Sequence, residues 1–433
     1  MRKHLSKALA LALAMSSLAS VSLAEGSVLN VWCWNDEFQS RFNAYYPEVK
    51  EVAEDKSTTT LNDGTIVKWT INPNADNNYQ NKLDEALLSQ ESAADDDKID
   101  MFLIEADYAL KYVDSPYTLD VRADIGLTDG DLDGQYKYTQ DIATADGVLK
   151  GVTWQATPGL FAYRRSIAKD VLGTDDPTEV AALLSSNDAM LDVAAKLKDK
   201  GIKMFASWQD IMNMQFSNRA QPWVVDDRLV IDESMLDFMD MAKTIAENGY
   251  DLNVDPWAPE WSAAVESTDT FCYVLPSWGY QFVVKPAADT TKGQWAMCQG
   301  SVPYVKGGTW LGIYKDSPNK DLAWAFLEYC CLNSEAQQAY AAEYGEYVSL
   351  KSADQALAAG AGEEVLGGQN PFAFYNEQME KIPSDLMTAY DGTINTAFLS
   401  AAKAYATGVL SKDDALQQFK DDVANAYPEL TID

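Results

Sequence analysis

Four short apolar segments of this chain each run directly into tryptophan, carboxylate or amide side chains, and a helix pattern then begins. The side chains that follow the segments are Trp34, Asn35 and Asp36 after 28–33, Glu105 and Asp107 after 101–104, Trp208 after 202–206, and Trp278 after 271–275. In open α/β sheets, ligands bind outside the carboxyl ends of the strands. We therefore expect these side chains to lie around one crevice.

The residue types at these strand ends indicate the chemistry of a ligand. Flat indole rings cover apolar C–H faces, while carboxylates and amides form hydrogen bonds with hydroxyl groups. Glu105 and Asp107 lie two residues apart, so an extended backbone would point both in the same direction, where ligand hydroxyls or an arginine would have to satisfy them. Asp36 also suits the N-cap of the following helix. The pattern favours a sugar as the ligand.

The elements around these residues alternate between strand and helix patterns. A helix starting at 36–37 and stopped at Pro47, a strand at 65–71, a helix starting at 76–78 and the strand that ends before Glu105 form a β-α-β-α-β series. Such a series predicts a doubly wound, mostly parallel sheet. Residues 150–159 break the pattern with glycine, Trp154 and proline, which predicts a segment that crosses between two lobes.

A second α/β series follows this crossing. It runs from Phe161 to about Cys298, with helices predicted at 167–172, 180–200 and 234–248. Gly307-Gly308 precedes a short strand that carries Trp310, and one long helix is predicted over 320–344. The chain after about Ser384 reads as mostly helical.

Histidine and cysteine usage excludes several enzyme classes. The only histidine is His4, inside the segment that we expect to be removed, which excludes Ser-His-Asp and Cys-His catalysis and the commonest metal ligand. The five cysteines match no zinc spacing and are expected mostly as buried thiols, with a Cys272–Cys298 disulfide left open. We expect no catalytic residue, no metal and no cofactor.

The first 24 residues read as a secretory signal, with three basic residues, an apolar stretch and a small-x-small site ending at Ala24. We expect export, with a periplasmic location as the simplest case and an extracellular or cell-surface one as the alternative. The precursor carries a formal charge of −33 (33 basic and 66 acidic residues), and loss of three basic residues would make it −36. Such a surface repels nucleic acid and anionic lipid.

The order and spacing of several motifs resemble the extracellular solute-binding proteins (family 1 type) of carbohydrate ABC transporters, the group that includes maltose-binding proteins. The motifs are LNVWCWN at 29–35, IDMFLIEAD at 99–107, GVTWQA at 151–156, PGLFAYRR at 158–165, SWG at 277–279, GGTWLGI at 307–313 and DSPNKDLAWAFL at 316–327. The resemblance covers nearly the whole chain after the signal. One departure is Tyr108, which follows Asp107 where a basic residue is common, and it leaves the particular sugar open.

The resemblance implies a two-lobed periplasmic-binding-protein fold of type II, with discontinuous α/β lobes joined by crossing hinge segments. The lobes would comprise 27–155 with 300–343, and 156–299 with 344–433. By position in the motifs, ligand contacts would come from Asn35, Asp36, Glu105, Asp107, Trp208, Trp278, Tyr390 and Asp391. Their places in the sequence add Trp34, Trp154 and Trp310 as further candidates. The resemblance also implies a monomer that binds a carbohydrate and delivers it to permease subunits of an ABC importer.

Three alternatives to this interpretation remain at the level of sequence. A secreted glycoside hydrolase would also need aromatic side chains and a pair of carboxylates. A cysteine-dependent enzyme on the same fold would need an activated thiol, yet the predicted crossing segment carries no cysteine. A polyamine or another cation would also suit acidic, aromatic surroundings on the same fold.

Overall fold

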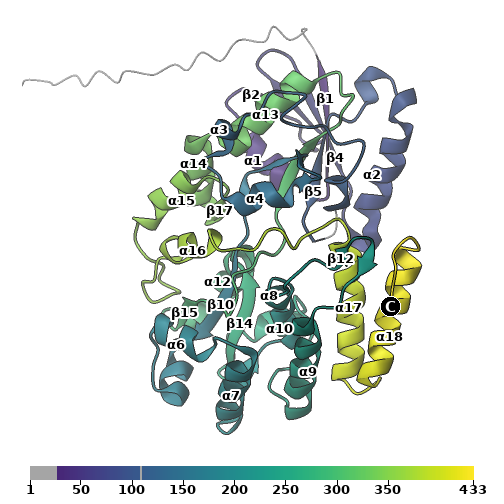
Figure 1. The fold of residues 1–433 in the computed structure, drawn as a ribbon. Coiled ribbons are helices and arrows are strands. Elements are labelled where there is room, and N and C mark those ends of the chain that lie inside the picture. Colours follow the sequence, from purple (N-terminus) through teal and green to yellow (C-terminus); the bar gives the residue numbers. More distant parts are fainter. Residues whose placement is uncertain (1–26, 108–109) are drawn as a thin grey trace, which may run out of the picture.

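The computed structural model describes residues 27–107 and 110–433. The expected signal segment, His4 and Tyr108 lie outside the described residues. Two β-sheets, each covered by helices, form two lobes that lie one above the other (Figure 1). The fold is therefore two-lobed and α/β, as the sequence predicts.

The first sheet has seven strands and is built around three parallel ones. Its order is β2 (Val49–Val52), β3 (Thr58–Leu61), β4 (Ile66–Ile71), β1 (Val28–Cys33), β5 (Met101–Glu105), β16 (Thr309–Ile313) and β8 (Val152–Thr153). Strand β1 pairs in parallel with β4 and β5, whereas β2, β3, β16 and β8 pair antiparallel. The expectation of a mostly parallel sheet therefore holds only for its centre.

The second sheet has four strands. Its order is β11 (Lys203–Phe205), β14 (Thr270–Pro276), β10 (Gly159–Arg164) and β15 (Trp295–Cys298). All residues of β10, β14 and β15 are buried, which explains their near-continuous apolar sequence. Three short two-stranded pairs complete the strands: β6 (Thr144–Ala145) with β7 (Val148–Leu149), β9 (Gln155–Ala156) with β17 (Tyr347–Val348), and β12 (Val224–Val225) with β13 (Arg228–Leu229).

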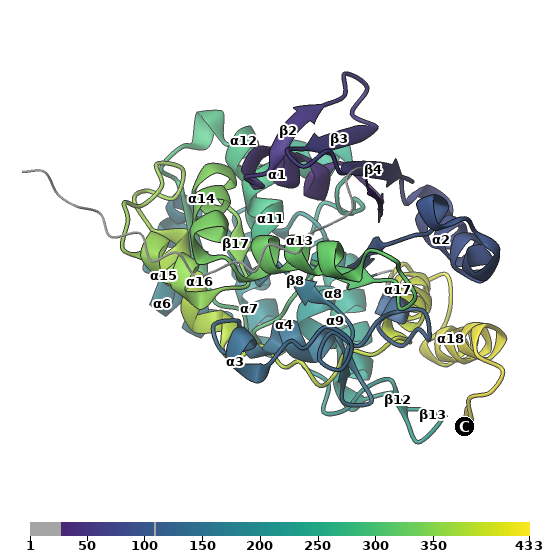
Figure 2. The ribbon, with the colours of Figure 1, turned by 90° about the horizontal axis from the view of Figure 1, so that it is seen from above.

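Helices cover both sheets, and α1 and α2 lie on opposite sides of the first sheet (Figure 2). The helices of the upper lobe are α1 (Glu37–Tyr45), α2 (Asn78–Ser89), α3 (Asp129–Leu132), α4 (Lys137–Ile142), α13 (Lys320–Leu332), α14 (Ser334–Tyr344) and α15 (Lys351–Ala358). The remaining helices are α5 (Arg165–Ile167), α6 (Pro177–Leu183), α7 (Asn187–Lys198), α8 (Met212–Phe216), α9 (Glu233–Asn248), α10 (Pro259–Ala263), α11 (Ser277–Gly279), α12 (Lys285–Ala287), α16 (Pro371–Met379), α17 (Asp391–Ala406) and α18 (Lys412–Ala426).

Two segments that connect the sheets run side by side. The chain passes from β8 to β10 through 154–158, at the predicted crossing, and returns from β15 to β16 through 299–308. The Gly159 amide donates to the Tyr304 carbonyl at 2.8 Å, and the Lys306 amide donates to the Thr157 carbonyl at 3.1 Å. Gly159 has to be glycine here, because a Cβ atom would lie 1.9 Å from the Tyr304 ring. The paired segments place the ends of both sheets next to one another.

Two predicted helices are each divided in the structure. Residues 320–344 form α13 and α14, because the Asn333 backbone is extended and its side chain accepts a hydrogen bond from the Ala336 amide, which caps α14. Residues 180–200 fall into α6 and α7, because Ser186 caps the second helix. The cysteines are free thiols, and all except the half-buried Cys330 are buried, so the disulfide left open for Cys272 and Cys298 is absent.

Candidate functional site

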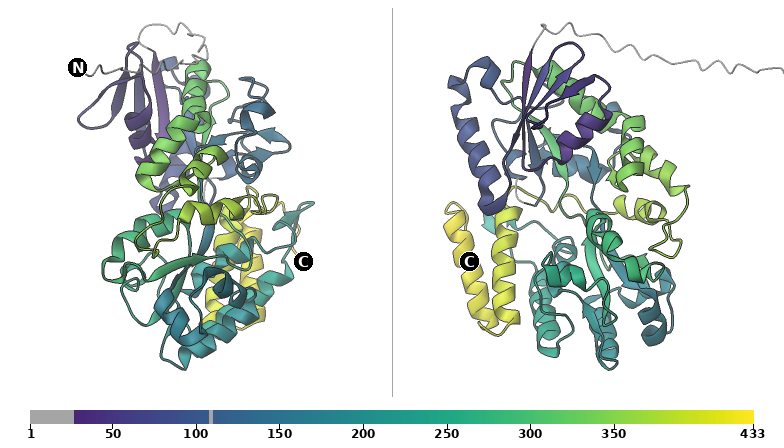
Figure 3. Two further views of the ribbon diagram at one scale, coloured as in Figure 1. Left: turned by 90° about the vertical axis from the view of Figure 1, so that its left-hand side faces the viewer. Right: turned by 180° about the vertical axis from the view of Figure 1, so that it is seen from behind.

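A hollow of about 530 Å³ lies between the two lobes, against the paired crossing segments. Its lining residues come from both lobes and from both crossings: Trp34, Asn35, Asp36, Glu37, Ser40, Arg41, Glu105, Gln155, Thr157, Trp278, Phe282, Gly307, Gly308, Thr309 and Tyr344. Figure 3 shows from two further sides how the lobes face each other across this region. Five of the eleven predicted contact residues belong to this lining: Trp34, Asn35, Asp36, Glu105 and Trp278. The other six do not line it.

The first lobe contributes the residues that follow β1. Trp34 is half-buried, and its ring packs edge-on against Tyr79, with the ring centroids 5.5 Å apart. Asn35 and Asp36 are exposed to the hollow. Asp36 occupies the N-cap position of α1 without a side-chain capping hydrogen bond, and it lies 3.9 Å from the Lys56 ammonium. These three side chains lie where the end of a strand was predicted to place them.

Gly307 and Gly308 form the floor of the hollow beside Glu105. The Ala106 amide donates to the Gly308 carbonyl at 3.2 Å, and the Thr157 hydroxyl donates to the Gly307 carbonyl at 2.9 Å. Both glycines have positive φ, 67° and 113°, which glycine adopts without steric strain. The two crossings and the end of β5 are thereby joined directly under the site.

Glu105 and Asp107 do not point to the same place. Strand β5 ends at Glu105, so the alternation of an extended backbone stops there. Glu105 lines the hollow, and its Oε2 atom accepts from the Asp107 amide at 2.6 Å. The Asp107 carboxylate instead accepts from the Gly307 amide at 3.1 Å and lines a second hollow of about 590 Å³ between α2 and the pair α17 and α18.

Charged side chains of the hollow are mostly negative. Asp36, Glu37 and Glu105 contribute carboxylates, and Arg41 is the one basic residue of the lining. The buried Arg41 guanidinium forms ion pairs with Glu346 and with Glu37, the latter at 3.4 Å, and lies over the Tyr344 ring. Gln155 donates its side-chain amide to the Glu37 carboxylate. Because Arg41 is held by two carboxylates, it offers a ligand little net positive charge.

The second lobe supplies two aromatic side chains. Trp278 is half-buried, and its indole nitrogen donates to the Lys306 carbonyl at 3.1 Å. Phe282 is 53% exposed and lies in the π-helical turn Tyr280–Val284. Single π-helical turns are frequent at functional sites. Trp34 and Trp278 thus offer indole rings from opposite lobes.

The second lobe also contains a buried carboxylate, Asp210, beside Trp261. Asp210 accepts from the Trp261 indole nitrogen at 2.7 Å and is 6% exposed. Burial raises the pKa of the Asp210 carboxyl to about 7, against the opposing effects of the Trp261 hydrogen bond and the Lys306 charge. Asp210 is therefore a group that titrates near neutral pH inside the second lobe.

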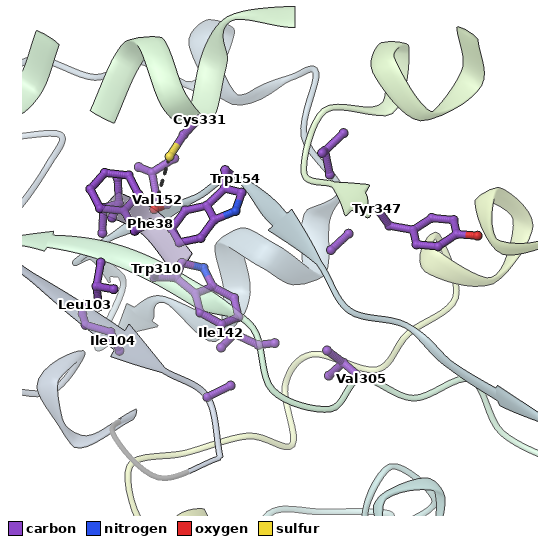
Figure 4. Packing of buried hydrophobic residues seen from close by; sticks show 14 of the residues in the cluster. Phe38, Leu103, Ile104, Ile142, Val152, Trp154, Val305, Trp310, Cys331 and Tyr347 are labelled. Atoms are coloured by element: carbon purple, nitrogen blue, oxygen red, sulfur yellow. Dashed lines mark hydrogen bonds between the residues drawn. The ribbon is translucent and has the colours of Figure 1, made fainter. Parts of the chain in front are cut away.

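Trp154 and Trp310, both expected as ligand contacts, lie in the core and do not line the hollow. Trp154 is 2% exposed and stacks on Phe38, with the ring centroids 5.2 Å apart. Trp310 is 2% exposed, because β16 lies between β5 and β8, and it donates to the Thr139 carbonyl. Figure 4 shows both rings among buried apolar side chains.

Trp208, Tyr390 and Asp391 are also placed elsewhere. Trp208 is 3% exposed and packs against Phe238, because it begins a buried turn after β11. Asp391 is buried in an ion pair with Arg219 at 2.9 Å. Tyr390 packs edge-on against Tyr427 at a centroid distance of 5.0 Å. All three side chains contact other parts of the protein and lie outside the lining of the hollow.

Several lining residues were not predicted from the sequence. Glu37, Ser40 and Arg41 lie on α1, whose start was predicted, so a polar face on that helix was an available signal. Phe282 and Tyr344 come from segments without any polar cluster, and nothing local marks them. Trp257 and Trp261 lie outside this lining, and Trp257 packs between Trp278 and Trp261.

Two features are absent from the part of the chain that the structure describes: a group of metal-binding side chains and a helix that could cross a membrane. Among residues 27–107 and 110–433, no three histidine, cysteine, aspartate or glutamate side chains are grouped so that they could hold a metal ion. No helix within these ranges has the length and apolar character needed to cross a membrane.

A two-lobed α/β fold with a polar and aromatic hollow between the lobes is typical of solute-binding proteins. The chain belongs to the bacterial extracellular solute-binding proteins, whose family model matches residues 56–363. No curated protein sequence matches the chain.

Solved structures of similar fold cover almost the whole chain. A protein described as extracellular solute-binding protein family 1 superposes with a TM-score of 0.73 at 18% identity, over 92% of this chain and 99% of its own. The galacto-N-biose-/lacto-N-biose I-binding protein of an ABC transporter from Bifidobacterium longum gives 0.70 at 11% identity, over 95% and 100%. An ABC transporter-associated binding protein from B. animalis subsp. lactis, in complex with β-1,6-galactobiose, gives 0.65 at 16% identity, over 94% and 99%.

Proposed function

We propose that this protein is the substrate-binding component of an ABC importer, and that it captures a sugar or oligosaccharide between its lobes. The observation that carries the proposal is the lining of the hollow, where Trp34 of one lobe and Trp278 of the other face a set of carboxylates and amides. Indole rings cover the apolar faces of a sugar, and Asn35, Asp36 and Glu105 accept or donate hydrogen bonds to its hydroxyls. The solved relatives that bind disaccharides support this ligand class.

Binding in this proposal involves no chemical step. Lobe closure would bury the ligand, and a ligand shifts the balance between open and closed forms only by its higher affinity for the closed form. The closed form would then dock on membrane permease subunits. The protein would act outside the cytoplasm, as expected for an extracellular family, and as a monomer.

For the lobes we propose the expected division with one change. The first lobe would comprise 27–155 with 300–358, and the second 156–299 with 359–433. Residues 344–358 are assigned to the first lobe because β17 pairs with β9 and the Leu350 amide donates to the Gln337 side chain of α14 at 3.0 Å. Segment 359–390, which contains α16, then becomes the third crossing.

The test is a binding screen on the purified protein. Lacto-N-biose, β-1,6-galactobiose, maltose and maltotriose would be titrated while tryptophan fluorescence and melting temperature are recorded, and the sugars would be analysed afterwards. Saturable binding of an intact sugar, lost in Trp278→Ala and kept in Trp208→Phe, is the expected result. Cleavage of a sugar would contradict the proposal and show that the protein is a hydrolase.

A cationic ligand is the second candidate, because three carboxylates of the lining are matched by one arginine that is itself paired. Spermidine and putrescine therefore belong in the screen. Attraction between a cation and this site would weaken as salt screens the charges, whereas binding of a neutral sugar would change little. If only the polyamines bind, and their binding weakens as salt is added, the ligand is a cation and not a sugar. The fold assignment would be unaffected.

A further inference from the structure

Trp257 adopts a backbone conformation that is unusual for a large side chain. Its φ is 68°, in the left-handed region that non-glycine residues seldom enter, and it directly precedes the short segment that leads into α10. Its side chain is 38% exposed, so burial alone does not explain the conformation. Strained backbone of this kind persists only where the surroundings fix it, and it is concentrated at functional sites.

The ring of Trp257 stacks on the ring of Trp278. Their centroids are 4.8 Å apart and their planes differ by 22°. Trp257 also packs against Trp261, with the ring centroids 4.7 Å apart. Gly279 makes room for this arrangement, since a Cβ atom there would lie 3.1 Å from Cη2 of Trp257 and 3.1 Å from a methyl group of Leu275. The three indoles therefore form one continuous wall, and only Trp278 lines the hollow.

Two aspartates anchor the loop segment that precedes Trp257. Asp251 accepts from the Trp208 amide at 3.1 Å, and Asp255 accepts from the side chains of Gln209 and Lys403 at 2.9 and 2.5 Å. Behind the stack, the Trp261 indole nitrogen donates to the buried Asp210 carboxylate. These contacts hold the loop and the Trp261 ring, on which Trp257 packs, through groups of the second lobe alone.

We propose that Trp257 is a positioning residue that holds the ligand-facing indole of Trp278. The hydrogen bond from Trp278 to the Lys306 carbonyl holds one edge of its ring, and it still permits rotation about the bonded edge. The Trp257 ring removes that freedom by covering one face. The Trp278 ring is then ordered before the ligand binds, which reduces the entropy lost on binding. This role rests on the proposed function only in so far as Trp278 contacts the ligand.

The test uses 5-fluorotryptophan in place of the twelve tryptophans and records ¹⁹F NMR spectra of the protein without ligand. The Trp278 resonance is assigned by its loss in Trp278→Phe. In Trp257→Ala we expect this resonance to shift and broaden, and in Trp257→Phe, which keeps an aromatic ring, to stay close to the parent spectrum. Trp324→Phe, in α13 of the first lobe and outside the lining, controls for loss of a tryptophan.

Affinity provides the second readout, with the disaccharides lacto-N-biose and β-1,6-galactobiose and with maltotriose as probes. For a probe that the parent binds, Trp257→Ala should weaken binding by about tenfold and Trp257→Phe by less than about threefold. An unchanged Trp278 resonance in Trp257→Ala, or unchanged affinity for a probe that the parent binds, would overturn the proposal. If the parent binds no probe, the proposed sugar function fails, and the ligand-free spectra alone decide the positioning role.

Discussion

Gly307 lies so close to the Glu105 carboxylate that a Cβ atom on it would be 3.0 Å from the Glu105 Oε1 atom. The same Cβ atom would also lie 3.5 Å from the indole nitrogen of Trp278. Glycine at this position therefore lets a carboxylate of the first lobe and a tryptophan of the second approach one another across a crossing segment. The spacing of the two sides of the site depends on this close approach.

Gly307→Ala should weaken ligand binding more than it lowers stability. The added methyl group pushes on Glu105, and alanine at a φ of 67° is strained by about 1 kcal/mol. We expect a loss of affinity of about tenfold or more for the sugar that the screen identifies, measured by calorimetry, with a small fall in melting temperature.

Gly64→Ala is the matched control for this substitution. Gly64 lies in the turn between β3 and β4 with a φ of 88°, and a Cβ atom there would meet nothing within 4 Å. It carries a similar backbone strain without steric contact, so melting temperature should fall while affinity stays the same. Equal affinity losses in the two variants would show that strain, and not the contact with Glu105, is responsible.

Asp210→Asn should make stability less dependent on pH. Burial raises the Asp210 pKa to about 7 from its ordinary value of 3.8, so between these values the folded protein keeps a proton that the unfolded chain has lost. The free energy of unfolding therefore falls as pH rises through this window, by about 1.4 kcal/mol for each unit of pKa shift. Asparagine resembles the protonated form and still accepts from Trp261. The variant should thus gain stability relative to the parent as pH rises from 4 towards 8.

Urea denaturation at several pH values between 4 and 8 measures this effect. The buried Asp100 and Asp354 are present in both proteins, so their contributions cancel in the difference. Asp237→Asn, which removes an exposed carboxylate of α9, controls for the change in net charge. Parallel profiles for parent and Asp210→Asn would contradict a raised pKa at Asp210.

The strand ends were predictable because apolar segments of four to six residues followed by polar clusters are a local pattern. Trp34, Asn35 and Asp36 therefore lie where β1 was expected to end, and Trp278 follows β14. The helix breaks at Ser186 and Asn333 were missed because the surrounding sequence is compatible with a continuous helix. Only the capping geometry shows where one helix stops and the next begins.

The division of the tryptophans into core and site could not be predicted from local sequence. Trp154, Trp310 and Trp278 all have small or polar neighbours, but their burial depends on partners distant in sequence. Trp310 is covered because β16 lies inside the sheet, and Trp154 because α1 brings Phe38 against it. Arg41 is held beside the site by an ion pair with Glu346, which lies about 300 residues away in the chain.

Asp391→Asn should destabilise the protein strongly, because it leaves the Arg219 guanidinium buried without its counter-charge. Both side chains are nearly inaccessible, and the ion pair joins the start of α17 to the segment after α8. Removing one partner of such a pair destabilises by about 3–5 kcal/mol. Chemical denaturation of Asp391→Asn measures the loss.

The double variant Arg219→Met with Asp391→Asn distinguishes charge from packing. Without the arginine no charge is stranded, and the asparagine introduced at position 391 can still accept from Thr388, so the double variant should be more stable than Asp391→Asn alone. Stability losses that simply add from the two single variants would show that the pair does not act as a unit.

Trp257→Gly should be more stable than Trp257→Ala, although both variants remove the same ring. Glycine enters the left-handed region freely, whereas alanine at a φ of 68° keeps the steric strain of the parent residue, worth about 1 kcal/mol. Both variants should lose affinity together, since neither supports Trp278. Melting temperatures and affinities measured side by side therefore separate the two properties of this residue. If the alanine variant proved the more stable of the two, the backbone at residue 257 would not be strained. The stacking of Trp257 on Trp278 would then not depend on an unfavourable backbone conformation.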